Sequence, residues 1–514
     1  MTSLDCSTPI DIGSRLELLV DDHLIAQLVG GAELRLNRPV PQEIALRTDA
    51  PWEGNASGGF TVFEDDGLYR MYYRGQQFDY SGNRLSRPRG KNICYAESEN
   101  GIDWVKPELG LVEFDGSTRN NIVVDGGEIL NGLFSPFKDG NPDCLPEERY
   151  KSLALMERGD ARGLWAFSSP DGIHWKEMSD GPVLTFGPFD TQNLAFWDGA
   201  RGEYRSYQRN EFRLPQTGEE PYGAHATAAG QSGDWADVRG SRYGRDILTA
   251  SSPDYIHWTD PVYVSYNDGR PDELYTNQVW PYFRAPHILL GFPTRYVERS
   301  WSDAHEDLPE LEHRRMRADI VERYGAAITD SLLMSSRDGY NFHLWQESFV
   351  RPGLRPVDNW TYGDNHQNWG IVTTRSPFAG APDELSIYFN EGYWRGESTS
   401  LRRYTLRVDG FASLQAPLSG GELITKPLIF AGSELVLNFS ASAAGSVRVE
   451  LLRDQMNTPV EGFRLEECVE VLGDDLERVV RWKSGHDLAG LAGVPVRLRF
   501  ALSDADLFSF RFRD

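Results

Sequence analysis

One seven-residue string recurs along this chain, and it constrains the fold more than any other feature. Its copies are SENGIDW at 98–104, SPDGIHW at 169–175, SPDYIHW at 252–258 and the looser SRDGYNF at 336–342, which runs on to Trp345. Their tryptophans lie 71, 83 and 87 residues apart. This period exceeds the roughly 40–50 residues of WD40 or kelch arrays, but it has the same meaning, one supersecondary unit repeated. An ordinary hairpin turn would not return at such regular spacing.

Each copy lies at a predicted hairpin. It follows a short run of strand-forming residues, at 93–96, 164–167, 247–250 and 331–334. The Asp-Gly pair makes a tight turn, because glycine accepts a positive φ without a steric penalty. The tryptophan then begins the return strand and can pack between neighbouring sheets. We therefore interpret the motif, including His174 and His257, as structural and assign it no catalysis.

The predicted fold class is all-β, a five-bladed β-propeller followed by a C-terminal β-sandwich. A ring of sheets protects its own edges, which a chain so rich in strands requires. Residues 1–50 are interpreted as a lead-in, whose strand-like stretch at 16–20 can add a strand to the last sheet and close the ring. Residues 51–417 form the propeller. Beyond them, alternating apolar and polar residues predict half-buried strands and a sandwich over 420–514.

Four strands are expected in each blade, an outer one after the repeated turn and three that lead up to it. In chain order the ranges of these three are 59–63, 68–75 and 93–104; 133–138, 150–156 and 164–175; 192–197, 203–209 and 246–258; 276–283, 288–296 and 328–345; and 367–374, 384–390 and 401–414. Two insertions stand out, a Gly-, Glu- and Ala-rich loop at 211–245 and a charged segment at 298–325. The second contains 308–315, which predicts the one real helix. Long loops of this kind commonly build the rim of a central pocket.

The composition excludes several classes of protein. With 40% hydrophobic and 12% aromatic residues the chain is not disordered, and 50 glycines and 29 prolines fit a turn-dense β protein. A formal charge of −25 repels phosphate backbones and anionic lipid, so nucleic-acid and membrane partners are disfavoured. No apolar stretch is long enough to span a membrane. Neutral sugars remain compatible with this surface.

The N-terminus and the cysteines bear on localisation. The first residues have neither a basic n-region nor an apolar h-region, so they are not a secretory signal. A natural start at Met1 predicts a cytoplasmic protein, although a secreted protein with its signal removed would begin in the same way. The cysteines Cys6, Cys94, Cys144 and Cys468 are scattered without CxxC spacing. They are expected to be reduced thiols rather than a metal site or a disulfide framework.

Candidate catalytic residues follow from the geometry of a propeller. Its inner strands begin around one axial funnel, so functional residues are expected just before or at these starts. Two carboxylates can perform acid/base hydrolysis of a sugar. We assign Glu273 as general acid, because it just precedes the polar cluster 275–278, and Asp190 as base or nucleophile. Glu53 and Asp364 are expected to orient the substrate or to serve as alternates.

Amides, aromatic residues and arginines make up the predicted substrate-binding set. Amide side chains exchange hydrogen bonds with sugar hydroxyls, and aromatic faces stack on sugar C–H surfaces. Arginines near second-strand ends can reach the same funnel. The set is Arg74, Gln192, Asn193, Tyr275, Asn277, Gln278, Arg295, His366, Asn368, Trp369, Glu391, Tyr393 and Arg395. No metal ligands are assigned.

Each of these residues also has a plainer interpretation. An acidic residue in a turn is commonly a cap, and Asp364 and Asp190 could each open an Asx turn. A lone histidine such as His366 is usually structural, but near the axis it could bind a cation or substrate. The stretch 64–67 resembles a calcium loop without its remaining ligands, and a hairpin turn explains it. A site is favoured because most inner-strand starts carry a cluster of carboxylates or amides.

The strand YRMYY at 69–73, the SPDGIHW string and the C-terminal strands together resemble the five-bladed β-propeller glycoside hydrolases of families 32, 43 and 68. With LVDDHLI at 19–25 and NLAFWD at 193–198, the chain is similar to uncharacterised bacterial proteins of that type. The resemblance implies sugar hydrolysis. However, residues 52–58 read WEGNASG without the expected Asp-Pro, and the R-D-P and E-C-P motifs are absent. The family's catalytic triad is therefore not transferred to this chain.

Three functions remain open from the sequence. The first is a glycoside hydrolase that removes a terminal sugar, possibly a furanoside, from a small glycan or oligosaccharide. The second is a phosphorylase or transglycosidase, for which Arg74, Arg295 and Arg395 are the available phosphate ligands. The third is a non-catalytic glycan-binding propeller, which would show only amides and aromatics in its funnel. No cofactor is expected to be required, although a structural or axial Ca²⁺ ion is possible.

Overall fold

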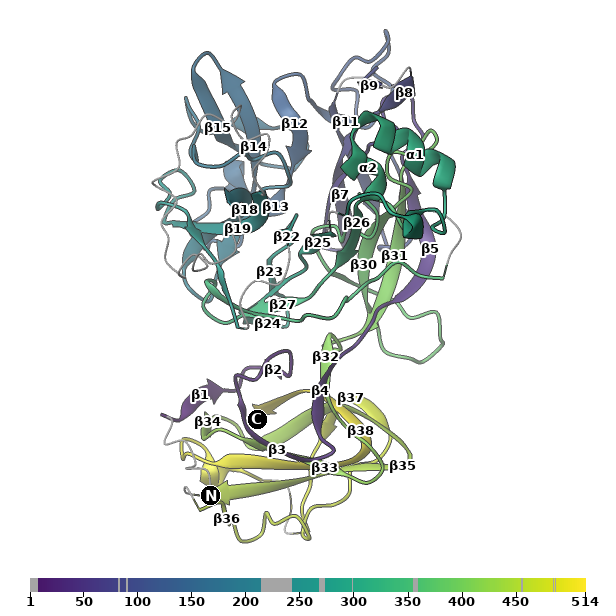
Figure 1. Cartoon of the computed structure of the whole chain (residues 1–514). Helices are drawn as coiled ribbons and strands as arrows, with labels where there is room; N and C mark the ends of the chain where they lie inside the picture. Colours follow the sequence, from purple (N-terminus) through teal and green to yellow (C-terminus); the bar gives the residue numbers. More distant parts are fainter. Residues whose placement is uncertain are drawn as a thin grey trace. The chain divides into compact units, whose positions relative to one another are not determined.

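A computed structural model describes residues 8–81, 84–88, 91–213, 243–267, 273–297, 299–354, 359–453, 456–483, 485 and 487–514. The chain divides into two compact units, each described here by itself (Figure 1). The larger contains 39–282 and 286–405, and the smaller contains the segment up to Arg38, 283–285 and 406–514. The lead-in is thus shared between the two units, and its first part folds with the C-terminal strands.

The larger unit is a series of small antiparallel sheets in chain order. The first sheet contains β6 (Gly58–Asp65), β7 (Leu68–Gly75), β10 (Asn92–Ser98) and β11 (Ile122–Asp125). The second contains β12 (Ile129–Phe134), β13 (Phe137–Lys138), β14 (Tyr150–Arg158), β15 (Ala161–Ser169) and β16 (Lys176–Glu177). The third contains β17 (Leu194–Asp198), β18 (Glu203–Arg213), β19 (Tyr243–Ser252) and β20 (Val262–Tyr263).

The fourth repeat is split into two small sheets. One contains β21 (Ser265–Tyr266), β23 (Trp280–Tyr282), β24 (Ala285–Gly291), β27 (Met334–Ser336) and β28 (Asn341–Leu344), and the other contains β22 (Glu273–Leu274), β25 (Thr294–Val297) and β26 (Ile328–Ser331). Pro293 separates β24 from β25, and its carbonyl accepts a hydrogen bond from the Leu332 N–H at 2.9 Å. A proline has no N–H to give to a ladder, so the single strand expected at 288–296 is interrupted here.

The last sheet of the larger unit is closed by a strand from the N-terminal part of the chain. It contains β29 (Val372–Thr374), β30 (Glu384–Glu391), β31 (Ser400–Arg407) and β5 (Val40–Arg47). The strand that the lead-in adds to the last sheet is therefore β5, which pairs with β31, and not the stretch at 16–20 that was expected there. Within that stretch β2 (Glu17–Leu18) instead pairs with β38 (Arg497–Arg513) of the smaller unit.

The repeated string joins several of the sheets to their neighbours. The Tyr72 hydroxyl on β7 donates to the Gly172 carbonyl at 2.9 Å, and the Tyr207 hydroxyl on β18 donates to the Gly339 carbonyl at 2.8 Å. In the same way Tyr388 on β30 donates to the carbonyl of Gly101. These hydrogen bonds join the first sheet to the second, the third to the fourth repeat, and the last back to the first. The motif is structural, as predicted.

The inner ends of the sheets meet at one place. Thr61 and Trp369 form an isolated parallel bridge, and the Trp369 indole N–H donates to the Val279 carbonyl at 2.9 Å. The Gln192 amide donates to the Thr61 hydroxyl at 3.1 Å and accepts from the Gln278 amide at 2.9 Å. Segments of the first, third, fourth and last repeats thus converge. The all-β unit is a β-propeller whose axis is filled by amide and indole side chains.

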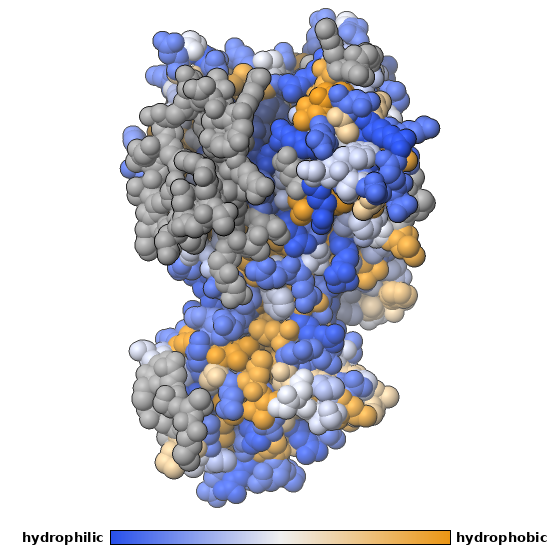
Figure 2. Space-filling model, in the orientation of Figure 1, coloured by the Kyte–Doolittle hydropathy of each residue, from blue (hydrophilic) through white to orange (hydrophobic). Residues whose placement is uncertain are grey.

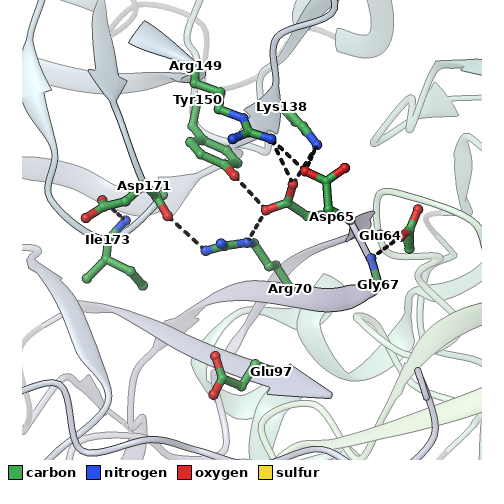
Figure 3. Close-up of polar contacts among 12 residues, drawn as sticks. Glu64, Asp65, Gly67, Arg70, Glu97, Lys138, Arg149, Tyr150, Asp171 and Ile173 are labelled. Atoms are coloured by element: carbon green, nitrogen blue, oxygen red, sulfur yellow. Dashed lines mark hydrogen bonds and ion pairs between the residues drawn. The ribbon is translucent and has the colours of Figure 1, made fainter. Parts of the chain in front are cut away.

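A buried ion cluster also ties the first two sheets together (Figure 3). The hairpin turn after β6, where the sequence resembled a calcium loop, presents Asp65 to Arg70 and Tyr150 at 2.6 Å each and to Lys138 at 2.7 Å. Burial acts to raise the pKa of Asp65, but these partners outweigh it and hold the pKa below its usual value. Arg70 also donates to the Asp171 carbonyl of the repeated string at 2.9 Å. The hairpin interpretation of 64–67 is confirmed.

The smaller unit is built on two long strands. They are β35 (Glu434–Arg453) and β38, which pair along most of their length. Around them lie β1 (Ile10–Gly13), β2, β3 (Ile25–Gly30), β4 (Glu33–Leu36), β32 (Ala412–Ala416), β33 (Gly421–Thr425), β34 (Leu428–Phe430), β36 (Thr458–Pro459) and β37 (Asp474–Val479). One hydrophobic core is shared by these strands. The strand expected at 401–414 is broken by a turn at Asp409, which has a φ of 63°, and its second half, β32, belongs here.

The insertion at 298–325 contains two helices rather than one. α1 spans Leu311–Ile320 and α2 spans Glu322–Ala326, with a 3₁₀ turn, η3, at Asp303–His305. The helix expected over 308–315 begins later because Pro309 and Glu310 precede it, and Glu310 has a φ of 63°. Most of the loop expected at 211–245 lies outside the described residues, but its two ends lengthen β18 and β19. In the described part of the chain, no helix has the length and apolar character needed to cross a membrane.

Candidate active site

Asp190 and Glu273 are brought to the same tyrosine by two arginines. Asp190 pairs with Arg209, and Glu273 pairs with Arg245 at 2.5 Å. The Arg209 guanidinium lies 4.5 Å from the centre of the Tyr275 ring, and the Arg245 guanidinium lies 5.5 Å from it. Cations over an aromatic face are attracted by the ring quadrupole. The two carboxylates assigned from the sequence therefore flank one cluster.

The fold explains this convergence. Arg209 and Arg245 lie on the paired strands β18 and β19 of the third sheet, and Glu273 begins β22 of the fourth repeat. Asp190 precedes β17, the inner strand of the third sheet. The Asp190 side chain is 52% exposed and that of Glu273 is 16% exposed. Asp190 thus precedes an inner strand, Glu273 is the first residue of β22, and both carboxylates have some access to solvent.

The cluster continues into the last sheet through Tyr275. Its hydroxyl lies 2.6 Å from that of Tyr362, and its ring centre lies 5.7 Å from that of His366. Burial lowers the pKa of His366 to about 4, so this imidazole is neutral at physiological pH. Its buried Nε2 has no hydrogen-bond partner among the described residues. His366 is therefore placed to exchange a hydrogen bond with a bound molecule.

The predicted amides divide between packing and the site. Gln192, Gln278 and Trp369 fill the axis, as described above, and Asn368 donates to the Asn390 Oδ1 atom at 2.9 Å. Three buried amide atoms have no partner within the described residues: Asn193 Oδ1, Asn277 Nδ2 and Gln278 Oε1. Buried polar atoms are normally paired with protein or with water. These three atoms are the amide groups of the set that remain able to bind a ligand or water.

Glu53 and Asp364 lie inside the protein rather than on an open funnel. Glu53 is fully buried and accepts from the Tyr73 hydroxyl at 2.5 Å and the Lys106 ammonium at 2.7 Å. Asp364 is also fully buried and accepts from the Thr361 hydroxyl at 2.5 Å. Burial raises the pKa of Asp364 to about 7. Both carboxylates hold neighbouring chain segments in place, so we do not retain them in the proposed catalytic set.

Three other predicted binding residues are engaged in ion pairs. Arg295 pairs with Asp330 at 2.5 Å, Arg395 pairs with Glu310 at 3.2 Å, and Glu391 pairs with Arg402 at 2.7 Å. A residue held in this way has less capacity for a ligand than an unpaired one. The other two members of the set, Arg74 and Tyr393, lie together, with the Arg74 Nη2 atom 3.2 Å from the Tyr393 hydroxyl.

Sequence reasoning missed the two arginines that organise the cluster. Arg209 was placed at the end of an expected strand without a role, and Arg245 fell in the expected loop. The loop composition hid the continuation of β19, which brings Arg245 opposite Glu211. A basic residue in each of two paired strands was the available signal. Among the described residues, no group of three or more His, Cys, Asp or Glu side chains forms a metal site.

No family model matches this sequence, and no curated protein matches it. Solved structures with a similar fold include an N-acetylgalactosamine deacetylase from F. plautii, with 13% identity, 73% of this chain and 96% of that chain covered, and a TM-score of 0.41. A β-1,2-mannobiose phosphorylase from Listeria innocua has 11% identity, with 73% and 98% covered and a TM-score of 0.39. A fructofuranosidase from Schwanniomyces occidentalis has 10% identity, with 98% and 99% covered and a TM-score of 0.37. At these scores the likeness assigns neither a family nor a reaction to this chain.

Proposed function

We propose that this protein is a glycosidase that cleaves a terminal sugar from a small glycan or oligosaccharide. The observation that carries the proposal is the convergence of Asp190 and Glu273 on Tyr275. A glycan-binding propeller needs only amides and aromatics, whereas hydrolysis of a glycosidic bond needs two carboxyl groups on either side of it. The solved structures with a similar fold include enzymes that act on oligosaccharides, which agrees with the proposal without supporting it further.

The two carboxylates take different parts in the proposed reaction. Glu273 gives its proton to the leaving-group oxygen as the glycosidic bond breaks. Asp190 either attacks the anomeric carbon, if the carboxyl groups lie about 5 Å apart, or takes a proton from the attacking water, if they lie roughly 6.5–9.5 Å apart. Arg245 holds Glu273 at 2.5 Å, so bound substrate must displace this pairing before Glu273 can carry a proton. Asp190 pairs with Arg209 in the structure.

The surroundings fit a neutral, hydroxyl-rich ligand at this position. His366 Nε2, Asn277 Nδ2 and Asn193 Oδ1 supply both donor and acceptor atoms, as a sugar with several hydroxyl groups requires. Most of the coloured surface of the larger unit in Figure 2 is hydrophilic. The proposed reaction uses no cofactor, so sugar release is expected to survive incubation with a chelator.

The test is a screen of the full chain against aryl glycosides and short oligosaccharides, furanosides included. Asp190→Asn and Glu273→Gln are assayed beside Glu108→Gln, a matched loss of an exposed carboxylate that pairs with Arg119 at 2.9 Å. We expect a sugar to be released by the parent protein and by Glu108→Gln, and its release to fall by at least ~10²-fold in the other two variants. Glycan binding without turnover in all four proteins would reject the proposal in favour of a lectin.

A further inference from the structure

Beside the carboxylate cluster, the same unit holds cations that no acid neutralises. Arg74 on β7 and Lys91, just before β10, form no ion pair with any described carboxylate, although the chain carries 77 acidic and 52 basic residues. Most other arginines near the inner-strand starts are paired, as Arg295 is with Asp330. Burial lowers the pKa of Lys91, and the charges of Arg87 and Arg74 lower it further. An acidic protein has thus left a local excess of positive charge.

The two cations are neighbours. A Cβ atom on Gly132 would stand 2.8 Å from both the Arg74 Cδ atom and the Lys91 Cβ atom. Arg74 is fixed by the carbonyls of Ala56 and Asn131, to which it donates at 2.9 and 3.0 Å. Its Nε atom is buried and has no hydrogen-bond partner among the described residues. A guanidinium held by two neutral carbonyls and a hydroxyl keeps its charge for a ligand, and burying it without an anion is costly.

Further donors lie at Gly58, next to the guanidinium end of Arg74. A Cβ atom on Gly58 would lie 3.4 Å from the Asn390 Nδ2 atom, 3.9 Å from the Tyr393 ring and 4.0 Å from the Arg74 Nη2 atom. The Asn390 Oδ1 atom is occupied, since it accepts from Asn368 at 2.9 Å, which leaves the NH₂ group turned toward the glycine. The Tyr393 hydroxyl accepts from Arg74 at 3.2 Å and keeps its own proton to give. The side chains that meet at Gly58 therefore present donors.

This cluster is linked to the proposed active site. The Asn131 carbonyl accepts from Arg74, and the Asn131 amide donates to the Phe189 carbonyl at 2.7 Å, immediately before Asp190. The Tyr393 ring lies 6.5 Å from that of Tyr362, whose hydroxyl meets Tyr275. The donor cluster and the carboxylate cluster thus lie at the same end of the sheets. A ligand group held at Gly58 would belong to the same reaction.

We propose that Arg74, Lys91, Asn390 and Tyr393 form an oxyanion subsite of the proposed glycan site, which takes a carboxylate, sulfate or phosphate group. A neutral sugar hydroxyl needs acceptors as well as donors, and a cation would be repelled. An oxyanion accepts from several donors at once, and hydrogen bonds from a guanidinium are roughly twice as strong as neutral ones. That the anion takes part in a glycan reaction rests on the proposed function, whereas anion binding itself does not.

The experiment measures anion binding to the full chain by isothermal titration calorimetry, without any turnover. Inorganic phosphate, inorganic sulfate and glucuronate are titrated at low and at physiological ionic strength, with methyl glucoside as the neutral comparison. Arg74→Gln removes the central cation. Asn390→Asp keeps the acceptor for Asn368 but puts a negative oxygen in place of the donor. It provides an independent test of the subsite if Arg74→Gln fails to fold. Arg119→Gln, which removes an exposed cation paired with Glu108, is the matched control.

We expect at least one anion to bind both the parent protein and Arg119→Gln, with an affinity that falls as salt is added. The affinity of this anion for Arg74→Gln and for Asn390→Asp should be lower by a factor of ~10 or more. Preference for phosphate or sulfate over glucuronate would identify a free oxyanion, and the reverse preference would identify an anionic group carried by the sugar. Either supports the subsite. Absence of binding by all three anions, or binding that neither variant weakens, would overturn it, whatever the glycosidase screen shows.

Discussion

The Tyr72 hydroxyl donates a hydrogen bond to the Gly172 carbonyl 2.9 Å away, and this contact joins the second strand of one sheet to the repeated turn of the next. The same carbonyl accepts from the Trp175 indole N–H at 3.0 Å. Trp175 also packs edge-on against Tyr72, with ring centres 6.3 Å apart. The repeated string therefore supplies contacts between neighbouring sheets, which explains why it recurs.

Removing this hydroxyl should weaken the larger unit without unfolding it. We expect Tyr72→Phe to lower the free energy of unfolding by about 1 kcal/mol, because one buried hydrogen bond is lost while the carbonyl keeps its bond to Trp175. Urea unfolding followed by tryptophan fluorescence measures the change. The control is Tyr324→Phe, whose hydroxyl makes no hydrogen bond among the described residues. Equal effects of both substitutions would show that the sheet-to-sheet contact contributes nothing.

A side chain added at Gly172 should destabilise the protein more than one added at another glycine that also has a positive φ. Its φ is 79°, and a Cβ atom there would lie 2.6 Å from the Tyr72 hydroxyl, whereas Gly159, with a φ of 59°, has open space around it. We expect Gly159→Ala to cost about 1 kcal/mol from backbone strain alone and Gly172→Ala roughly 3 kcal/mol, since overlap is added to strain. The comparison is made by urea midpoint, and similar costs at both sites would contradict it.

The third copy of the string shows that the turn residue equivalent to Gly172 and the strand residue equivalent to Tyr72 change together. Here Tyr255 replaces the glycine, with a φ of 71°, and is fully buried. On the preceding sheet the residue in register with Tyr72 is Leu153, paired with Ala166 as Tyr72 is with Tyr95. Where the donor tyrosine is missing from the strand, a tyrosine from the turn fills the space. The sequence change at Tyr255 is thus a packing exchange, with no functional role assigned.

The ionised carboxylate of Asp254, in the third copy, should contribute to the free energy of unfolding, and this contribution should be lost at low pH. Burial acts to raise its pKa, but hydrogen bonds from the His257 backbone and ring and from the Ile256 N–H outweigh it and lower the pKa to about 2. An unfolded aspartate titrates near 4. Because the folded pKa is the lower one, the contribution is complete above about pH 4 and is lost as the pH falls to about 2.

We therefore expect Asp254→Asn to be less stable than the parent protein near neutral pH by an amount that stays constant down to about pH 5 and shrinks between pH 4 and pH 2. Urea unfolding at a series of pH values measures the difference. Asp260→Asn is the control, since the exposed Asp260 accepts no hydrogen bond among the described residues. A difference that does not change with pH would contradict the assignment of the hydrogen bonds to the ionised carboxylate.

Tyr362 should act on the reaction through Tyr275. Its hydroxyl lies 2.6 Å from that of Tyr275, and its backbone carbonyl accepts from the buried Arg317 of α1 at 2.8 Å. We expect Tyr362→Phe to lower kcat of the proposed hydrolysis by roughly fivefold with little change in KM, because the loss of about 1 kcal/mol from one hydrogen bond that orients Tyr275 is felt in the transition state. Tyr324→Phe is the control, since the Tyr324 ring stacks on that of Tyr362 with centres 5.9 Å apart. A matching rise in KM alone would show a role in binding instead.

Local patterns predicted much of the fold, and tertiary pairing decided what they missed. The strand Leu68–Gly75 and the turn before it were predicted because a run of strand-forming residues and an Asp-Gly pair are both local signals. Two features were missed: the fourth repeat is split at Pro293, and β32 belongs to the smaller unit. Both depend on which strands pair with each other in the folded protein. A hydropathy pattern does not specify that.

The site shows the same limit. Asp190 and Glu273 were selected because they were expected at inner-strand starts, and the arginines with which they pair both lie over the Tyr275 ring. Glu53 lies at a similar position in the sequence, yet its partners Lys106 and Tyr73 come from distant segments and bury it. Arg245 was missed because the composition of 211–245 is that of a loop. Position along a strand predicted proximity to the axis, but it did not predict which charges would be neutralised.

The central claim is that Asp190 and Glu273 act together on one glycosidic bond, and a double-variant cycle tests it most directly. Rates of sugar release are measured for Asp190→Asn, Glu273→Gln and the double variant under identical conditions. Residues of one catalytic unit are strongly non-additive, so we predict a fall of ~10²–10⁴-fold in each single variant and a double variant no slower than the worse of the two. Single variants that retain the parent rate, or losses that simply multiply, would contradict the account.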